Sequence, residues 1–198
     1  MNFNIRLVQT FLLYYITFAS VTSIAQVPYE RILNSNEEPE NWLTYNGGYM
    51  SQRHSLLNQV TRENVDRLKL KWVLQNQVFG AWQSNPIIVD GVMYVTERPN
   101  SVMAVDAVNG RVFWKYRHQN ADNALVCCGA NNRGVAVLND KVYMGTLDAQ
   151  LVALDRINGQ LLWKAEVGDA MIEQIKAEAA KSKKKGAKDD QIKAGKSQ

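Results

Sequence analysis

Short runs of hydrophobic residues, separated by tight turns, occupy the middle of the chain. Four such runs lie at residues 87–89, 92–95, 102–105 and 112–116. Asp90-Gly91 joins the first two runs as a two-residue hairpin turn, and Asn109-Gly110 precedes the last run. The third run is apolar throughout, as expected of a strand that is covered on both faces. The pattern predicts four consecutive antiparallel strands.

The same pattern occurs twice. Residues 86–115 and 135–164 align without gaps at an offset of 49 residues. Five matching pairs recur at this offset: Tyr94/Tyr143, Ala104/Ala153, Asp106/Asp155, Gly110/Gly159 and Trp114/Trp163. Four short strands in a repeat of roughly 40–50 residues are typical of a β-propeller blade, which buries its apolar faces on its neighbours. A β-sandwich would account for the strands but not for the gapless repeat. We therefore predict an all-β fold, an incomplete β-propeller of about two four-stranded blades, in which Asp106 and Asp155 have structural places before turns.

Two further elements are expected ahead of the first unit. Residues 58–67 are interpreted as a short helix, with Thr61 as its N-cap. Residues 68–73 are interpreted as a lone strand, in which Trp72 takes the place that Trp114 has in a blade. Propellers often close by letting a strand from one end complete a blade from the other end, and this strand is suited to that use.

The first 25 residues resemble a secretory signal peptide. They carry one positive charge before an apolar stretch at 11–19, and Ser23 and Ala25 provide the small residues of a cleavage site ahead of Gln26. An uncleaved membrane anchor is the alternative, but the apolar stretch is short for a bilayer span, which needs roughly 20 residues. We expect an exported, periplasmic protein without a stable membrane span after cleavage.

Charge separates the last 28 residues from the rest of the chain. Residues 171–198 hold eight lysines against four acidic residues, which accounts for the whole net charge of +4. The rest of the chain is neutral overall, so no basic face indicates a nucleic-acid partner. Residues 169–198 are expected to form a short helix and a disordered Lys-rich tail, leaving residues 26–168 as the propeller domain.

The two cysteines are adjacent, at Cys127 and Cys128. Neighbouring Cα atoms lie about 3.8 Å apart, whereas ordinary disulfides need roughly 4.4–6.8 Å. A bond between them would close a strained eight-membered ring and offer a stiff, flat, polarisable surface. Two separate reduced cysteines are the alternative. Because an exported protein meets oxidising conditions and this chain has no other cysteine, we expect the ring. Metal binding is not expected, since neither His54 nor His118 stands at ligand spacing from the pair.

Arg133 follows five residues after the cysteine pair, just ahead of a predicted strand. The N–H donors of its planar guanidinium have a fixed arrangement, which suits a ligand that carries carboxylates or a quinone. A structural arginine that pairs with a neighbouring blade would have the same sequence. Composition alone does not separate these two interpretations.

Several motifs together resemble the quinoprotein alcohol dehydrogenases. They comprise residues 46–57, the spaced positions from Gln59 to Trp72, residues 86–96, the Cys-Cys-Gly-x-x-Asn-Arg run at 127–133, and the Ala-Leu-Asp, Asn-Gly and Leu-Trp positions between 153 and 163. The resemblance covers about residues 27–168. It implies the N-terminal part of an eight-bladed, PQQ-repeat propeller whose exported members bind pyrroloquinoline quinone (PQQ) and a calcium or lanthanide ion on the propeller axis.

The resemblance also implies roles for individual residues. Cys127 and Cys128 would form a vicinal disulfide against one face of PQQ, and Arg133 would reach the quinone edge. Thr146 looks like the threonine that hydrogen-bonds a PQQ carboxylate. Gln83 stands where better-known members carry a glutamate that contacts PQQ, so hydrogen bonding is kept and a negative charge is lost.

The family's catalytic aspartate, its metal-binding residues and the tryptophan on the other face of PQQ lie in later blades, so we assign no catalytic or metal-binding residue here. The whole protein would oxidise an alcohol and pass electrons to an acceptor such as a cytochrome c. This chain alone is expected to be inactive. Two alternatives remain: a non-catalytic binding or scaffold module completed by a partner chain, and a purely structural exported β-repeat protein, against which the cysteine motif argues.

Overall fold

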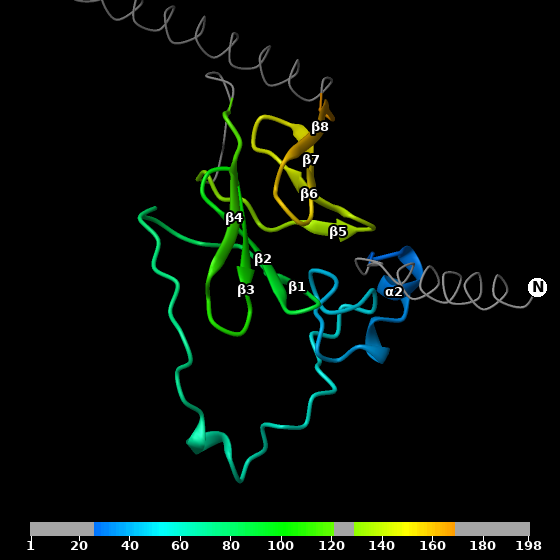
Figure 1. Ribbon diagram of the computed structural model, residues 1–198, viewed down its shortest axis with the longest axis vertical. Helices are drawn as coiled ribbons and strands as arrows, with labels where there is room; N and C mark the ends of the chain where they lie inside the picture. Colours follow the sequence, from blue (N-terminus) through cyan, green and yellow to red (C-terminus); the bar gives the residue numbers. More distant parts are fainter. Residues whose placement is uncertain (1–25, 121–128, 169–198) are drawn as a thin grey trace, which may run out of the picture.

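The computed structural model describes residues 26–120 and 129–168 (Figure 1). Their regular structure is almost entirely β, in two antiparallel sheets of four strands each, ordered β1-β2-β3-β4 and β5-β6-β7-β8. The strands are β1 (Ile87–Val89), β2 (Val92–Glu97), β3 (Ser101–Asp106), β4 (Val112–Arg117), β5 (Ala136–Leu138), β6 (Lys141–Gly145), β7 (Gln150–Asp155) and β8 (Leu161–Glu166). This confirms the predicted all-β, incomplete propeller and its two blades.

The turns form where the sequence places residues that tolerate a left-handed backbone. Asp90 and Gly91 have φ values of 51° and 77°, as a tight hairpin between β1 and β2 requires. Asp106 accepts hydrogen bonds from the backbone of Val108 and the side chain of Asn109, at 2.8 Å and 2.7 Å, and so closes the β3–β4 turn. Asp155 does the same with two backbone N–H groups of the β7–β8 turn. The structural interpretation of both aspartates is confirmed.

The two sheets have the same strand register, including the same register shift. In the first sheet Tyr94 pairs with Ala104, which pairs with Trp114, and the register shifts directly after Ala104. In the second sheet Tyr143, Ala153 and Trp163 form the same row, with the same shift after the alanine. The small alanine lets the two rings approach, and the ring centroids are 5.9 Å apart in both sheets.

Tryptophans join each element to the next along the chain. The indole Nε1 of Trp114 donates to the carbonyl of Arg156 at 3.2 Å, and its ring covers Gly159 in the β7–β8 turn. Trp72 makes the same contact with the preceding sheet: its Nε1 donates to Ala107 O at 3.1 Å, and its ring covers Gly110. Trp72 therefore has the place that Trp114 has, as the sequence predicted.

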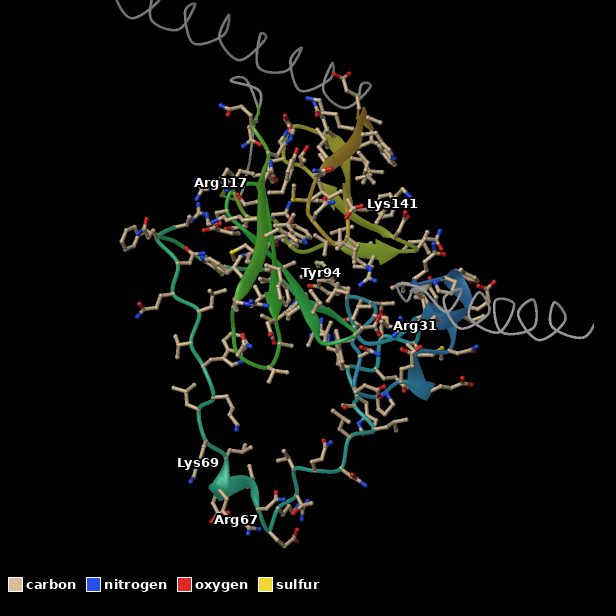
Figure 2. The ribbon with its side chains drawn as sticks, in the orientation of Figure 1. Arg31, Arg67, Lys69, Tyr94, Arg117 and Lys141 are labelled. Carbon is tan, nitrogen blue, oxygen red and sulfur yellow. The ribbon has the colours of Figure 1, made fainter. Side chains whose placement is uncertain are left out.

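The segment that carries Trp72 differs from its prediction. Residues 68–73 are not a strand, because a strand needs a hydrogen-bonded neighbour and none of the described residues pairs with them. The helix expected at 58–67 is wrong in length: only a 3-10 turn forms, η2 (Val65–Arg67), preceded by Asn64 rather than capped by Thr61. Figure 2 shows Arg67 and Lys69 at the tip of a long excursion away from both sheets.

The N-terminal part contains a connection that sequence analysis did not predict. Helix α2 (Tyr29–Leu33) and the 3-10 turn η1 (Ser35–Glu37) lie between two isolated bridges, one on each sheet. Val27 pairs with Asn139 in the β5–β6 turn, and Trp42 pairs with Ile88 on the edge of β1. The segment thus ties the two sheets together at one end (Figure 1).

One hydrophobic core runs between the sheets. Tyr94, Met144 and Leu154 are fully buried there, with Val27 and Leu43 closing the core from the N-terminal segment. Figure 2 shows Tyr94 where the sheets meet. In contrast, every residue of β8 is exposed, and Trp163 remains 41% exposed. No helix among the described residues is long and apolar enough to span a membrane.

Candidate functional site

An open cavity of about 340 Å³ lies where the segment leading into β5 meets the end of β6. Its lining has one cation, no acidic side chain and two side-chain amides: Tyr45, Asn131, Asn132, Arg133, Gly134, Val135, Gly145 and Leu147. The cavity therefore collects the Asn-Asn-Arg-Gly part of the cysteine motif on one side and residues flanking Thr146 on the other.

Asn132 fixes the path of the motif through its side chain. Its Nδ2 donates to the Gly145 carbonyl at 2.8 Å and to Asn100 Oδ1 at 3.1 Å, and its Oδ1 accepts from the Gly134 N–H at 3.1 Å. The residue is buried, so these bonds replace the water that the amide loses on folding. Asn132 thus links the motif to both sheets.

Arg133 is held by its backbone and leaves its side chain in solvent. Its carbonyl accepts from the Asn85 N–H at 3.1 Å, next to the parallel bridge between Asn85 and Gly134. Gly134 has a φ of 135°, and a Cβ there would lie 2.9 Å from Asn85 O, so this close approach needs glycine. Within residues 26–120 and 129–168 the Arg133 guanidinium has no hydrogen-bond or ion-pair partner, so it pairs with neither of the two described sheets.

The cavity also contains an unpaired polar atom. Asn131 Oδ1 is buried and has no hydrogen-bond partner in the described part of the chain, although the Asn131 backbone N–H donates to Gly129 O at 2.9 Å. An unsatisfied buried amide oxygen costs free energy of about 1–3 kcal/mol, unless a ligand or water supplies a donor.

Thr146 lies in the β6–β7 turn, between the lining residues Gly145 and Leu147. Its hydroxyl accepts from the Gln150 N–H at 2.9 Å and lies within donating distance of Asp148 Oδ1 and Gln150 O. The hydroxyl therefore closes its own turn. The Thr146 hydroxyl has one proton to donate. A ligand carboxylate at Thr146 would compete for it with Asp148 Oδ1 and Gln150 O.

The remaining predicted site residues fall in different places. Gln83 is exposed and precedes β1 at the position that Asn132 has before β5, 49 residues later. Two residues after it, Asn85 contacts Arg133 and donates its side-chain N–H to Tyr45 O. Cys127 and Cys128 lie outside the described residues, as do the predicted signal peptide and C-terminal tail. The structure thus brings the Gln83 segment, Arg133 and the Thr146 turn to one end of the two sheets.

A buried acid–base pair supports the same turn. His118 Nε2 lies 3.0 Å from both carboxylate oxygens of Asp148, and the two side chains are only 3% and 5% exposed. Tyr116 is affected by this pair. Burial of the Tyr116 ring raises its pKa above the ordinary value, and the negative charge of Asp148 adds to the increase. His118 follows β4 and Asp148 follows Thr146, so the pair joins the end of the first sheet to the second.

Of the eight lining residues, sequence reasoning assigned a site role only to Arg133. Asn131 and Asn132 stand inside the cysteine motif, and their amides were the available signal. Tyr45 and Leu147 come from distant parts of the chain, and no local pattern marks them. In the described part of the chain no group of three or more His, Cys, Asp or Glu side chains could hold a metal ion.

The arrangement suits an anionic, hydrogen-bonding ligand. Arg133 supplies a free planar cation, and Asn131 supplies an amide oxygen without a partner among the described residues. The lining has no carboxylate that would repel a ligand carboxylate. The arginine, in a lining without carboxylates, therefore suits an anionic ligand.

Comparisons with known proteins identify the family. The family described as "Glucose/ethanol/alcohol dehydrogenase, beta-propeller domain" (PQQ) matches residues 42–186. The dehydrogenase subunit of a quinone-linked alcohol dehydrogenase from Gluconacetobacter polyoxogenes is 40% identical over 142 residues, which cover 71% of this chain and 19% of that protein. A quinohemoprotein alcohol dehydrogenase from Pseudomonas putida is 41% identical over 132 residues, covering 66% and 18%.

Solved structures give the same result. The quinohemoprotein alcohol dehydrogenase structure from Pseudomonas putida has a TM-score of 0.66 at 39% identity, covering 72% of this chain and 21% of that one. A europium-containing methanol dehydrogenase also has a TM-score of 0.66, at 34% identity, with 71% and 25% covered. The chain spans about a fifth to a quarter of the length of these relatives. It belongs to the family of the PQQ-type β-propeller domain of glucose, ethanol and alcohol dehydrogenases.

Proposed function

We propose that this chain forms one wall of the PQQ site in an exported quinoprotein alcohol dehydrogenase. The observation that carries the proposal is the Arg133 side chain, which lines a cavity without acidic residues and has no partner in the described part of the chain. Family membership supports the identity of the ligand, and the carboxylates of PQQ match the charge and geometry of a guanidinium.

Each residue of the wall has a separate task. Arg133 binds an anionic or quinone oxygen of the cofactor, and Asn131 hydrogen-bonds a polar group beside it. Asn132 holds the motif in place, and Gln83 and Thr146 contribute neutral hydrogen-bonding groups at the rim. PQQ, when bound, supplies the redox chemistry that takes electrons from an alcohol. A calcium or lanthanide ion would be held by residues outside those assigned here.

Cys127 and Cys128 are proposed to form a vicinal disulfide that supports the flat cofactor. We expect the intact mass of exported protein to increase by about two hydrogens on reduction, because one sulfur–sulfur bond accepts two. Alkylation without prior reduction should then leave both cysteines unlabelled. Two alkylated cysteines in non-reduced protein would contradict this part of the proposal.

The direct test is PQQ binding by the purified chain. Titration calorimetry should detect PQQ binding to the wild type, and Arg133→Gln should weaken it at least about tenfold, as expected when a charge-assisted bond is lost. Arg111→Gln is the matched control, because Arg111 lies at the β3–β4 turn and stacks on Phe113 instead. Absence of binding by the wild type, or equal affinities for wild type and Arg133→Gln, would contradict the proposal.

The 198-residue chain is proposed to have no turnover by itself. In the family that it resembles, the catalytic base and the metal ligands come from later blades. Dye-linked oxidation of ethanol, with PQQ and either Ca²⁺ or a lanthanide, should not exceed a control without protein. A rate above that control would contradict the assignment of a partial site and would require a base among these residues.

A further inference from the structure

Asn100 makes an unusual number of hydrogen bonds for one side chain. It stands in the turn between β2 and β3 and is fully buried. Its Oδ1 accepts from Asn132 Nδ2 at 3.1 Å and from the Leu147 N–H at 3.2 Å. Its Nδ2 donates to Asn120 Oδ1. A single amide therefore joins three segments that are far apart in sequence.

Two of these segments carry walls of the cavity. Asn132 precedes Arg133 directly, and Leu147 itself lines the cavity from the β6–β7 turn of the second sheet. Asn132 also bonds the carbonyl of Gly145, a further lining residue. The Asn100 amide thus connects the Arg133 wall and the Leu147 wall from behind, without lining the cavity itself.

The repeat provides an internal comparison. The residue 49 positions after Asn100 is Ala149, in the equivalent β6–β7 turn. The backbone bond is kept, since His118 N donates to Asn100 O at 2.8 Å and Val167 N donates to Ala149 O at 2.9 Å. The backbone of the two turns differs, because Ala149 is left-handed, with a φ of 58°, and Asn100 is not. The side-chain bonds of Asn100 described above all lead outside its own turn.

Removal of the amide has a specific physical consequence. Asn132 Nδ2 would keep its bond to Gly145 O, but the Leu147 N–H and the Asn120 side chain would lose their partner. A buried N–H without an acceptor loses its hydration and gains nothing in return, so local opening that admits water becomes easier. The effect should be centred on the two cavity walls.

We propose that Asn100 is a positioning residue, which holds Arg133 and the Leu147 turn in the mutual arrangement that binds the quinone. The inference rests on the proposed function for the identity of the ligand. It adds that affinity depends on a buried amide that does not touch the cofactor and acts through Asn132 and the Leu147 N–H.

The test compares Asn100→Ala with Asn109→Ala in the full chain. Asn109 is the matched control, because it is also a turn asparagine of the first sheet but bonds only within the β3–β4 turn. Amide hydrogen exchange is measured at Leu147 and Gly134, with Val152 of β7 as an internal reference. PQQ affinity is measured by calorimetry on the same samples.

We expect Asn100→Ala to speed exchange at Leu147 and Gly134 about tenfold, with Val152 unchanged, and to weaken PQQ binding about tenfold. Asn109→Ala should change neither quantity. The double variant Asn100→Ala/Asn132→Ala should weaken PQQ binding by less than the sum of the two single losses, because both variants remove the same Asn100–Asn132 bond.

Unchanged exchange and affinity in Asn100→Ala would overturn the inference, as would additive losses in the double variant. Faster exchange with unchanged affinity would overturn the role in binding. If the wild type binds no PQQ, the proposed function fails, and so does the identification of the ligand in this inference. The exchange result then still decides, without PQQ, whether Asn100 holds the two walls.

Discussion

Gly110 and Gly159 each lie directly beneath an indole ring. Their φ values are 78° and 72°, and a Cβ would lie 2.6 Å from Trp72 and 2.5 Å from Trp114. Two independent constraints therefore select glycine at these turns: the left-handed backbone and the space under the ring. Gly91 has a similar φ of 77°, but a methyl group on its Cα would have no heavy atom within 4 Å, so only the first constraint applies there.

This contrast gives a prediction at the scale of single residues. Gly91→Ala should lower the free energy of unfolding by about 1–2 kcal/mol, the usual penalty for a left-handed alanine. Gly159→Ala should cost at least about 1 kcal/mol more, because Trp114 must also move from the turn. Urea denaturation followed by tryptophan fluorescence measures both. Equal losses in the two variants would show that the indole contact contributes nothing.

Several single residues could be predicted from the sequence and several could not. The hairpin glycines, Asp106, Asp155 and the equivalence of Trp72 with Trp114 followed from local chemistry and the repeat. Asn100 gave no such signal, because its role depends on bonds to residues 20, 32 and 47 positions away. Tyr45 reaches the cavity only through folding of the N-terminal segment. Contacts between residues that are far apart in the chain produce no periodic pattern in the sequence.

Among the elements, strands were predicted better than helices. Each blade strand has its partner within the repeat, so the hydrophobic pattern and the turns determined it. Residues 68–73 have strand-like composition but no pairing partner among the described residues, which is why they remain extended without becoming a strand. Helix α2 was not predicted, because it spans only Tyr29–Leu33 and buries a single residue, Ile32.

The attachment of α2 to the first sheet has an electrostatic part besides the burial of Ile32, and this part should depend on pH. The guanidinium of Arg31 bonds both Glu38 and Asp90, and this bond holds the pKa of Asp90 below its ordinary value, against the opposing effect of partial burial. The same contacts raise the pKa of Arg31. A lowered folded-state pKa means that the stabilisation is present above the unfolded-state pKa and is lost as the pH falls through the folded-state value.

We therefore expect the wild type to lose more stability than Asp90→Asn as the pH falls from 5 to below the ordinary aspartate pKa of 3.8. Because the pair is partly exposed and screened by water, the difference should be about 0.5–1 kcal/mol. Denaturation midpoints across this range measure it. Arg31→Gln should flatten the profile to the same extent. Parallel profiles for wild type and Asp90→Asn would show that the pair does not stabilise the fold.

At the scale of the whole molecule, the second sheet has one covered and one uncovered side. Trp114 covers its β7–β8 turn, whereas β8 is exposed along its whole length. Leu161, Leu162 and Trp163 are each more than 40% exposed. Such a row of apolar side chains is what a propeller blade presents to the next blade.

The two blade tryptophans should therefore differ in their contribution to stability. Trp114→Phe should lower the free energy of unfolding by about 1–3 kcal/mol, since it removes the bond to Arg156 O and the cover over Gly159. Trp163→Phe should cost less than about 0.5 kcal/mol, because phenylalanine keeps the contact with Tyr143 and no turn is lost. Urea denaturation at two protein concentrations measures both. A large, concentration-dependent cost of Trp163→Phe would instead show that β8 is covered by another copy.

The tryptophan contact also limits how copies of this chain can associate. It is directional, with an indole on one side and a glycine turn on the other, so a two-fold dimer cannot satisfy it and only head-to-tail stacking could. Head-to-tail stacking without closure would produce open filaments. Both glycine turns of the described sheets are already occupied, by Trp72 and Trp114, so the exposed Trp163 of a second copy finds no vacant acceptor there. The excursion that carries Trp72 thus fills the glycine turn of the first sheet, which the Trp163 of a second copy would otherwise contact.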